Sequence, residues 1–227
     1  VLLAVRPRIP LTRSTGTTVR ADVRDGMAYL RHTPRVRDLV ITLSGLNVFV
    51  GPVLSVGLAL HAVASGWGAV GLGWLTASIG VGAALGTLVA LRWRPRFPLR
   101  AAVLLLFAQA SALAVVGVGD FTATLVGTTV VGVVAGLASP MLSGAFQATV
   151  DEEYVGRVSS VLTLADDALA PLSMAGFGLL AGVIGLGAAS SLFAACFIAL
   201  LLFAISRPHV RDLRIDGSLP SEERNSR

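Results

Sequence analysis

The sequence contains no lysine and only one cysteine, so all 18 basic residues among its 227 are arginines. A lone cysteine, Cys196, can form neither a disulfide framework nor a cysteine-based metal site, and a small buried hydrophobic residue is its expected role. Without lysine there is no Gly-Lys phosphate-binding loop, which argues against ATP-driven chemistry. We therefore predict neither a metal nor another cofactor.

Charged residues are also scarce. They make up 14% of the chain, whereas a soluble domain usually carries about 25%. Hydrophobic residues account for 54% and recur in long runs, which predicts an all-α polytopic membrane protein surrounded by lipid. The formal net charge of +5 could indicate a nucleic-acid partner, but arginines in cytoplasmic membrane loops explain it better, so no such partner is predicted.

Six apolar segments follow a polar lead, and each is close to or above the roughly 20 residues that a helix needs to cross a bilayer. We expect membrane-spanning helices over about 39–63, 68–91, 100–118, 122–149, 155–183 and 186–206.

The arginines predict the topology of these helices. Eight precede the first segment, four lie between the second and third, Arg157 lies between the fourth and fifth, and five follow the sixth. The alternate connections, near 65–66, 119–120 and 185, have none. Because cytoplasmic loops are rich in arginine, both ends of this chain are expected in the cytoplasm, and the expected location is the cell membrane.

The regions outside the six segments differ from one another. Residues 1–5 resemble the end of a preceding membrane helix, so we expect a fragment of a longer protein. The rest of 1–38 is an arginine-rich cytoplasmic loop. In it Val23, Met27 and Leu30 have the spacing of an amphipathic helix at the membrane surface. The tail, 207–227, is charged and is predicted to be a disordered cytoplasmic segment.

Three stretches carry a family resemblance: "RDGMAYLRHTPRVRDLV", "SPMLSGAFQATVDEEYVGRVSSV" and "LAPLSMAGFGLLAG". With the six segments and their topology, they resemble the C-terminal half of a major facilitator superfamily transporter, most closely the enterobactin-exporter and macrolide-efflux type. The second stretch matches the family's run of Gln, then Pro-Asp-Glu-x-x-Gly-Arg, except that Asp151 replaces the proline.

A further stretch, "GTLVALRWRPR", departs from the family's pattern. Gly86 and Leu88 match its loop between two helices and the arginines roughly match, but Ala90 and Leu91 occupy the positions where an aspartate is expected. The resemblance therefore does not extend to the charge relay of that loop. By resemblance, the candidates for a cytoplasmic gate and its loops are Gly86, Arg92, Glu152, Glu153, Gly156 and Arg157.

The resemblance implies two inverted three-helix repeats and a substrate site near the midplane, between this half and an N-terminal six-helix half. It implies secondary transport and not enzymatic catalysis. The expected direction is export, coupled to protons that move the opposite way (antiport). Few polar groups among apolar walls favour small, largely apolar substrates, as in multidrug exporters.

The fifth segment offers the strongest candidates for proton coupling. Ser159, Thr163, Asp166 and Ser173 share one helical face. If hydrocarbon begins near Val158, Asp166 lies ~12 Å deep, where a charge costs roughly 2.5–3.5 kcal/mol. We expect it to face a cavity or a partner, or to be neutral. Asp167 points about 100° away, so the second coupling candidate should play a different part.

Uncharged polar residues on the other segments are candidates for the substrate path or for bridges between helices. They are Asn47, Gln109, Ser139, Ser143, Gln147 and Thr163. Glycine pairs four residues apart, 82/86, 132/136 and 178/182, predict close helix packing. His61, near the outer end of the first segment, is expected to face water.

Two alternatives compete with transport. An intramembrane protease would need a Gly two residues before Ser143 and a His on the last segment, but Met141 occupies the first position and 186–206 contains no His. A scaffold or regulatory protein that does not transport is the stronger alternative, and only a transport measurement separates it from a transporter.

Overall fold

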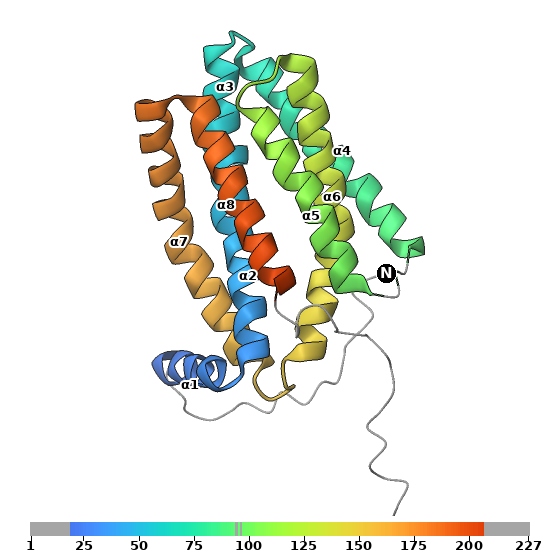
Figure 1. The fold of residues 1–227 in the computed structure, drawn as a ribbon, viewed down its shortest axis with the longest axis vertical. Helices are drawn as coiled ribbons and strands as arrows, with labels where there is room; N and C mark the ends of the chain where they lie inside the picture. The colour runs from blue at the N-terminus through green and yellow to red at the C-terminus, as the bar shows by residue number, and fades with distance from the viewer. Residues whose placement is uncertain (1–18, 94, 96, 207–227) are drawn as a thin grey trace, which may run out of the picture.

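The computed structural model describes residues 19–93, 95 and 97–206, which form helices joined by short connections and contain no strand (Figure 1). The predicted helix end at 1–5 and the predicted cytoplasmic tail lie outside these residues. The all-α fold class is confirmed, since six helices are long and apolar enough to cross a membrane.

The six helices agree closely with the segments predicted from hydropathy. The first covers Pro34–Ala64 and is divided into α2 (Pro34–Pro52), η2 (Val53–Gly57) and α3 (Leu58–Ala64). The others are α4 (Gly68–Arg92), α5 (Pro98–Val116), α6 (Phe121–Thr149), α7 (Val155–Ile184) and α8 (Leu186–Ser206).

Local sequence explains where these helices begin and end. Pro34 and Pro98 occupy the first helical positions, where the missing N–H costs nothing. Asp120 caps α6, because its carboxylate accepts a 2.7 Å hydrogen bond from the Ala123 N–H. Gly185 has φ +86°, a conformation that favours glycine, and it alone joins α7 to α8. Such short connections make successive helices antiparallel.

The first membrane helix changes its winding in the middle. Pro52 cannot donate a backbone hydrogen bond, and the five residues that follow it, Val53–Gly57, form a π-helical turn. Gly57 in this turn lies against the ring of Phe177 from α7, where a Cβ would be 3.0 Å from Cζ. Phe177 in turn packs edge-on against Phe193 of α8, with ring centroids 5.0 Å apart. The turn is therefore held within the aromatic core.

Close packing of α4 against α6 depends on glycine. A Cβ on Gly82 or Gly86 would overlap the backbone of α6, and one on Gly132 or Gly136 would overlap the backbone of α4. The predicted contact is thus confirmed for the pairs 82/86 and 132/136, whose missing side chains let the two backbones touch. The pair 178/182 on α7 makes no such contact, since Gly182 has no atom of the described chain within 4 Å of its Cβ position.

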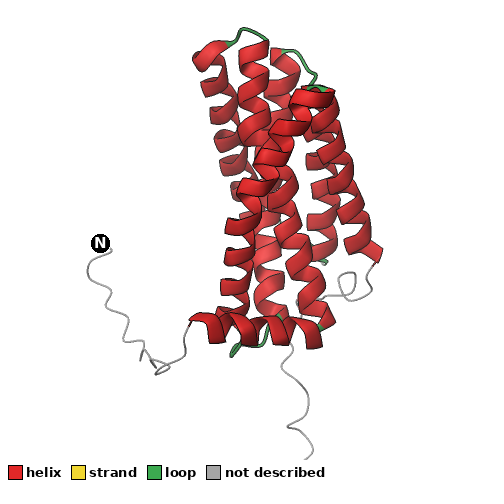
Figure 2. Ribbon diagram, turned by 90° about the vertical axis from the view of Figure 1, so that its left-hand side faces the viewer, coloured by secondary structure: helices red, strands yellow, loops and turns green. Residues whose placement is uncertain are grey.

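Helix α1 (Val19–His32) lies across one end of the bundle, roughly perpendicular to the membrane helices (Figure 2). Leu30 is buried against the bundle, but Met27 is 50% exposed, so the predicted apolar stripe faces the protein only in part. The two tyrosines of the chain hold α1 to the start of α7: Tyr29 stacks on Tyr154 with ring centroids 4.3 Å apart. The Tyr29 hydroxyl also donates a 2.9 Å hydrogen bond to the Asp151 carboxylate.

This contact predicts a pH-dependent release of α1. Burial, together with the hydrogen bond to Asp151 and its negative charge, raises the pKa of Tyr29 above 10.0. Because docking of α1 raises the pKa of Tyr29, the ring contact stabilises docked α1 fully below about pH 10, the pKa of a free tyrosine. This stabilisation is lost as the pH rises through the higher pKa that Tyr29 has in the docked state. Spin labels at Met27 and Glu153, both exposed, should move apart at that pH. Tyr29→Phe should remove the pH step, and an unchanged step in this variant would contradict the assignment.

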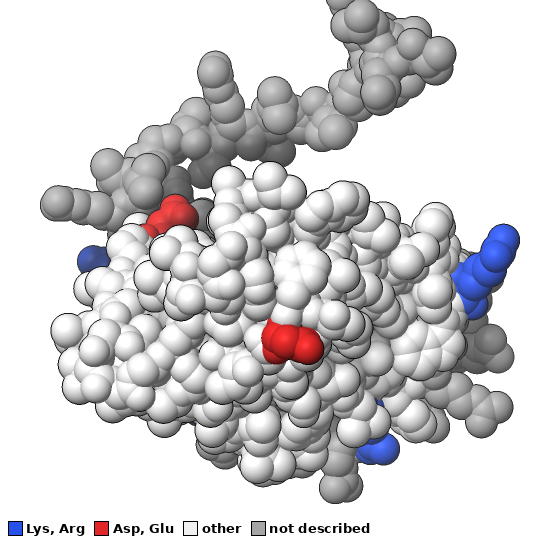
Figure 3. Space-filling view, turned by 90° about the horizontal axis from the view of Figure 1, so that it is seen from above, with Lys and Arg blue, Asp and Glu red and all other residues white. Residues whose placement is uncertain are grey.

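Charge is distributed unequally between the two ends of the bundle. The described arginines occur in α1, at the start of α2, at the end of α4, in the first turn of α5 and at the start of α7, which all lie at the same end. Viewed from the opposite end, the surface is almost free of charge (Figure 3), and its three connections contain one charged residue, Asp120.

His61, at this uncharged end, was predicted to face water but is buried. It is 9% exposed, and its Nε2 lies 2.8 Å from the carbonyl oxygen of Gly119. The ring also packs edge-on against Trp67. Because Gly119 lies just before α6, this contact ties the end of the first membrane helix to the α5–α6 connection. The sequence did not predict the contact, since the two residues are 58 positions apart.

Candidate functional site

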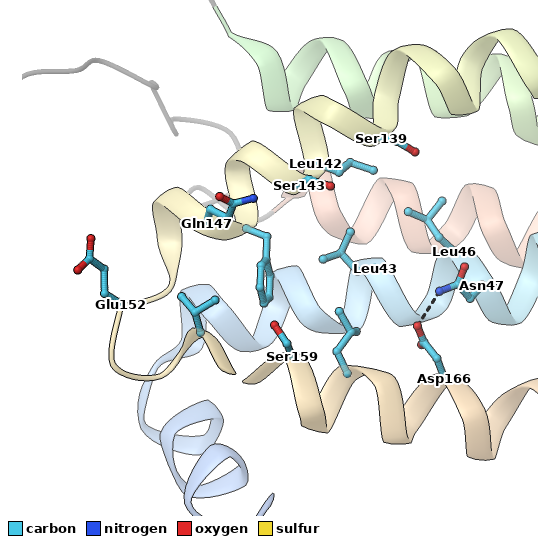
Figure 4. Close-up of a pocket in the computed structure, with 13 residues that line it drawn as sticks. Leu43, Leu46, Asn47, Ser139, Leu142, Ser143, Gln147, Glu152, Ser159 and Asp166 are labelled. Carbon is cyan, nitrogen blue, oxygen red and sulfur yellow. Dashed lines mark hydrogen bonds between the residues drawn. The ribbon is translucent and has the colours of Figure 1, made fainter. Parts of the chain in front are cut away.

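A cavity of about 630 Å³ lies between α2, α6 and α7 and extends to the α6–α7 connection (Figure 4). Of the residues predicted for proton coupling, the substrate path or the gate, six line this cavity: Asn47, Ser139, Ser143, Gln147, Glu152 and Asp166. Because α2 is far from α6 and α7 in the sequence, only the fold brings the three elements together. The cavity is the candidate functional site.

Asp166 is tied to Asn47 across the α2–α7 boundary. The Asn47 Nδ2 donates a 2.7 Å hydrogen bond to Asp166 Oδ2, although the residues are 119 positions apart in the sequence. The second carboxylate oxygen, Oδ1, is buried and has no hydrogen-bond partner among the described residues. A buried polar atom left unsatisfied costs about 1–3 kcal/mol, and more when it is charged. This oxygen is therefore an uncompensated polar atom in the described part of the cavity wall.

The α6 wall supplies uncharged polar groups. Ser139, Ser143 and Gln147 follow one another at four-residue spacing and all line the cavity (Figure 4). The small and polar residues of α6 thus have two roles: Gly132 and Gly136 pack on α4, whereas the serines and the glutamine face the cavity.

The face predicted on α7 is divided as well. Ser159 and Asp166 line the cavity, but Thr163 from the same face is exposed and does not. Asp167, predicted to lie off this face, is exposed outside the cavity as well. The Ser173 hydroxyl donates 3.0 Å to the carbonyl of Ala170 in its own helix. Gln109 lies elsewhere, in the core on α5, where it is 5% exposed and its Oε1 has no partner among the described residues.

The predicted gate residues do not form one cluster in the structure. Gly86 is buried in the α4–α6 contact, and Arg92 is exposed at the end of α4. Glu152 lines the cavity, while its neighbour Glu153 is exposed outside it. Gly156, at the start of α7, is exposed as well. Arg157 faces a separate hollow beside α1 and lies over the Tyr154 ring, 5.4 Å from its centroid.

Sequence reasoning missed the apolar walls of the cavity and a buried acid near it. Leu43, Leu46, Leu142, Phe146, Val155 and Leu162 complete the lining. Asp38, before the first apolar run, is only 4% exposed, with a carboxylate oxygen 3.7 Å from the Arg37 Nε. An acid directly before a membrane segment is a weak signal, and leucines that face a cavity are indistinguishable in sequence from leucines that face lipid.

The chemistry available at this site is acid–base chemistry and polar or apolar binding. Among the described residues, no group of three or more His, Cys, Asp or Glu is placed to hold a metal ion. Ser143, the nucleophile that an intramembrane protease would need, lies in the cavity lining. The lining contains no histidine that could act as its base.

Comparisons with protein-family models and with curated proteins find no match to this sequence. The structure by itself therefore defines the class: an all-α protein with six helices able to cross a membrane and a polar cavity between three of them.

Proposed function

We propose that this chain is the C-terminal half of a major facilitator superfamily transporter that exchanges protons for small molecules and exports them. The observation that carries the proposal is the Asp166 carboxylate in a cavity between membrane helices, with Asn47 on one oxygen and the other oxygen buried without a described partner. The sequence resemblance supplies the family, the six-helix repeat organisation and the direction of transport.

Proton coupling follows from the environment of Asp166. With Oδ2 bound by a neutral amide and Oδ1 without a partner among the described residues, the ionised carboxylate has little to offset its charge in this cavity. A proton on Oδ1 removes that charge. Opening of the cavity to one side of the membrane or the other would then let the same oxygen take up and release the proton, which is the requirement for coupling.

A second six-helix unit is the proposed partner. The outer face of α7 is largely exposed, including Leu172, Leu179 and Gly182. Asp167 lies on this helix about 4 Å from its midpoint, at ~1.5 Å per residue, and is exposed. A charge there facing lipid would cost roughly 2.5–3.5 kcal/mol. A partner with polar groups at this depth would remove most of that cost.

The same proposal includes the orientation. The protein lies in the plasma membrane. The end of the bundle that carries the arginines and α1 faces the cytoplasm, because basic residues are retained on that side. The cavity lies toward this end, so the geometry corresponds to a state open to the cytoplasm.

The test is transport by the chain together with its N-terminal half in sealed vesicles. We expect an imposed proton gradient to drive accumulation of a fluorescent lipophilic amine, and a protonophore to abolish it. Protein-free vesicles with the same gradient are the control, because a lipophilic amine also distributes passively across a bilayer along a pH gradient. Absence of gradient-driven movement for a panel of lipophilic dyes, with both halves correctly inserted, would favour the scaffold or regulatory function instead.

A further inference from the structure

We propose that a groove between α5 and α6 binds an aminophospholipid, with an acyl chain along the groove and the headgroup ammonium on Asp120 Oδ2. The proposal goes beyond the proposed function, because it uses neither the cavity of Asp166 nor transport. It requires only that these helices cross a membrane, as their length and composition allow.

Small side chains create the groove, a hollow of about 580 Å³ between the last turns of α5 and the first turns of α6. Ala112 and Gly127 are buried at its floor. A Cβ on Gly127 would lie 3.3 Å from the Ala112 carbonyl oxygen, so the two helices touch here and no large side chain fills the space. Val115 on α5 and Val126 on α6 lie beside this floor, and Val126 is 58% exposed. None of the residues that line the groove also lines the cavity of Asp166.

The length of the groove corresponds to one leaflet of a bilayer. Its lining on α6 begins at Thr122, beside the uncharged end of the bundle, and reaches Val130. These residues are about 12 Å apart at ~1.5 Å per residue, and half of a hydrocarbon core of ~30 Å is ~15 Å. An acyl chain of the adjacent leaflet would therefore lie along the whole groove. A partner helix that crosses the membrane would meet the groove over only about half of its length.

A single carboxylate lies at the mouth of this groove. Asp120 lines it and is the one charged residue in the three connections at this end, which is almost free of charge (Figure 3). Its Oδ1 caps α6 by accepting a hydrogen bond from the Ala123 N–H, and its Oδ2 has no hydrogen bond or ion pair with any described residue. The groove lining contains no basic residue. An anionic headgroup would meet this negative charge without a counter-charge, whereas an ammonium group would complement it.

The other polar groups of the groove follow the order of groups in a phospholipid. Thr122, next to the mouth, is exposed, and its hydroxyl makes no hydrogen bond within the described part of the chain, so it can donate to a phosphate oxygen. Ser111, further from the mouth, donates 3.0 Å to the carbonyl of Phe107 in its own helix. The mouth thus offers an acceptor for an ammonium group and a donor for a phosphate, and the rest of the groove accepts an apolar chain.

The carboxylate also distinguishes between kinds of ammonium group. An ethanolamine headgroup has N–H bonds, so it can donate a charge-assisted hydrogen bond to Asp120 Oδ2. A choline headgroup has the same charge but no N–H bond, and a glycerol headgroup leaves the phosphate negative without an ammonium. Ethanolamine phospholipids are therefore the expected ligand.

The experiment measures which lipids the full chain retains. It is placed in nanodiscs containing equal amounts of ethanolamine, choline and glycerol phospholipids with identical acyl chains. The protein is then released in a mass spectrometer under non-denaturing conditions, and bound lipids are identified by mass. We expect about three- to fivefold enrichment of ethanolamine over choline lipid, the scale of an exposed ion pair, and the least retention of glycerol lipid. An N,N-dimethylethanolamine lipid, which keeps one N–H bond, should be enriched over the choline lipid as well.

One pair of variants tests the headgroup contact. Asp120→Asn should abolish the enrichment but preserve the fold, because asparagine caps a helix about as well as aspartate does. Glu153→Gln is the matched control, since it removes an exposed carboxylate at the opposite end of the bundle, and it should leave the enrichment unchanged. Equal retention of ethanolamine and choline lipids by the unmodified chain, or equal losses in the two variants, would overturn the proposal.

A second pair tests the groove itself. Ala123→Leu places a larger side chain in the groove and should reduce the number of retained lipids. Ala84→Leu, at an exposed position of α4 outside the groove, should not. Circular dichroism and elution volume show whether each variant is folded. If Ala123→Leu changed the oligomeric state and not lipid retention, the groove would be a contact between copies of the chain, and the lipid site would be overturned.

The lipid site and the proposed function fail separately. Lipid retention is measured on this chain without its proposed N-terminal half, so absence of gradient-driven transport would leave the site intact. Transport that depends on Asp166, without enrichment of ethanolamine lipid, would overturn the lipid site alone.

Discussion

Gly82→Leu is expected to prevent assembly of the six-helix bundle. A Cβ at this position would lie 2.5 Å from the carbonyl oxygen of Thr129, 3.0 Å from the Val133 nitrogen and 3.2 Å from the Gly132 Cα. These are backbone atoms of α6, which cannot rotate away as a side chain can, so α4 and α6 would have to separate. Overpacking against mobile side chains already costs about 1–3 kcal/mol, and a leucine against backbone should cost more.

The same helix provides a matched control. Gly80, two positions earlier on α4, has no atom of the described chain within 4 Å of its Cβ position, so Gly80→Leu should preserve the fold. Both substitutions also raise helix propensity by a similar amount, about 0.8–1 kcal/mol, which cancels in the comparison. Thermal unfolding and the yield of monodisperse protein in detergent are the measurements. Equal stability of the two variants would show that α4 and α6 are not in backbone contact.

Asp166→Asn is expected to reduce proton-driven transport to the level measured with a protonophore. The amide has nearly the shape of the carboxylic acid and can still contact Asn47, but it cannot bind and release a proton. The variant should therefore insert and fold normally while it loses coupling. The measurement is gradient-driven substrate movement in sealed vesicles containing both halves, normalised to the amount of inserted protein.

Asp166→Glu provides the complementary variant, because it retains a titratable carboxylate at a slightly different position. We expect it to keep part of the gradient-driven movement, and this partial activity would separate loss of the proton site from a disturbance of helix packing. Normal coupled transport by Asp166→Asn would remove Asp166 from the coupling mechanism and leave Glu152 as the remaining ionisable residue of the cavity.

The extent of each membrane helix was predictable from sequence because it depends on local properties. A run of apolar residues must be long enough to cross the bilayer, and glycine, proline and charge mark its ends. For this reason the predicted segment 68–91 became Gly68–Arg92, and 186–206 became Leu186–Ser206. The face of α7 that bears Asp166 was also predictable, since helical periodicity determines which residues share a face.

Which faces meet was decided only by the tertiary structure. Gly178 and Gly182 have the same spacing as Gly82 and Gly86, yet only the second pair packs against a helix. Gln109 and Asn47 are both single amides in apolar segments, but one lies in the core and the other holds Asp166.

The sequence by itself therefore determined the number and length of the helices and which of their ends carry the arginines, since each of these properties depends on residues close together in the chain. The tertiary structure decided that α2, α6 and α7 enclose a cavity, that Tyr29 stacks on Tyr154, and that His61 is buried against Gly119. The hydrogen bonds from His61 to Gly119, from Asn47 to Asp166 and from Tyr29 to Asp151 join residues 58, 119 and 122 positions apart. Their formation depends on how side chains from several helices fit together, which the hydropathy of a single helix does not record.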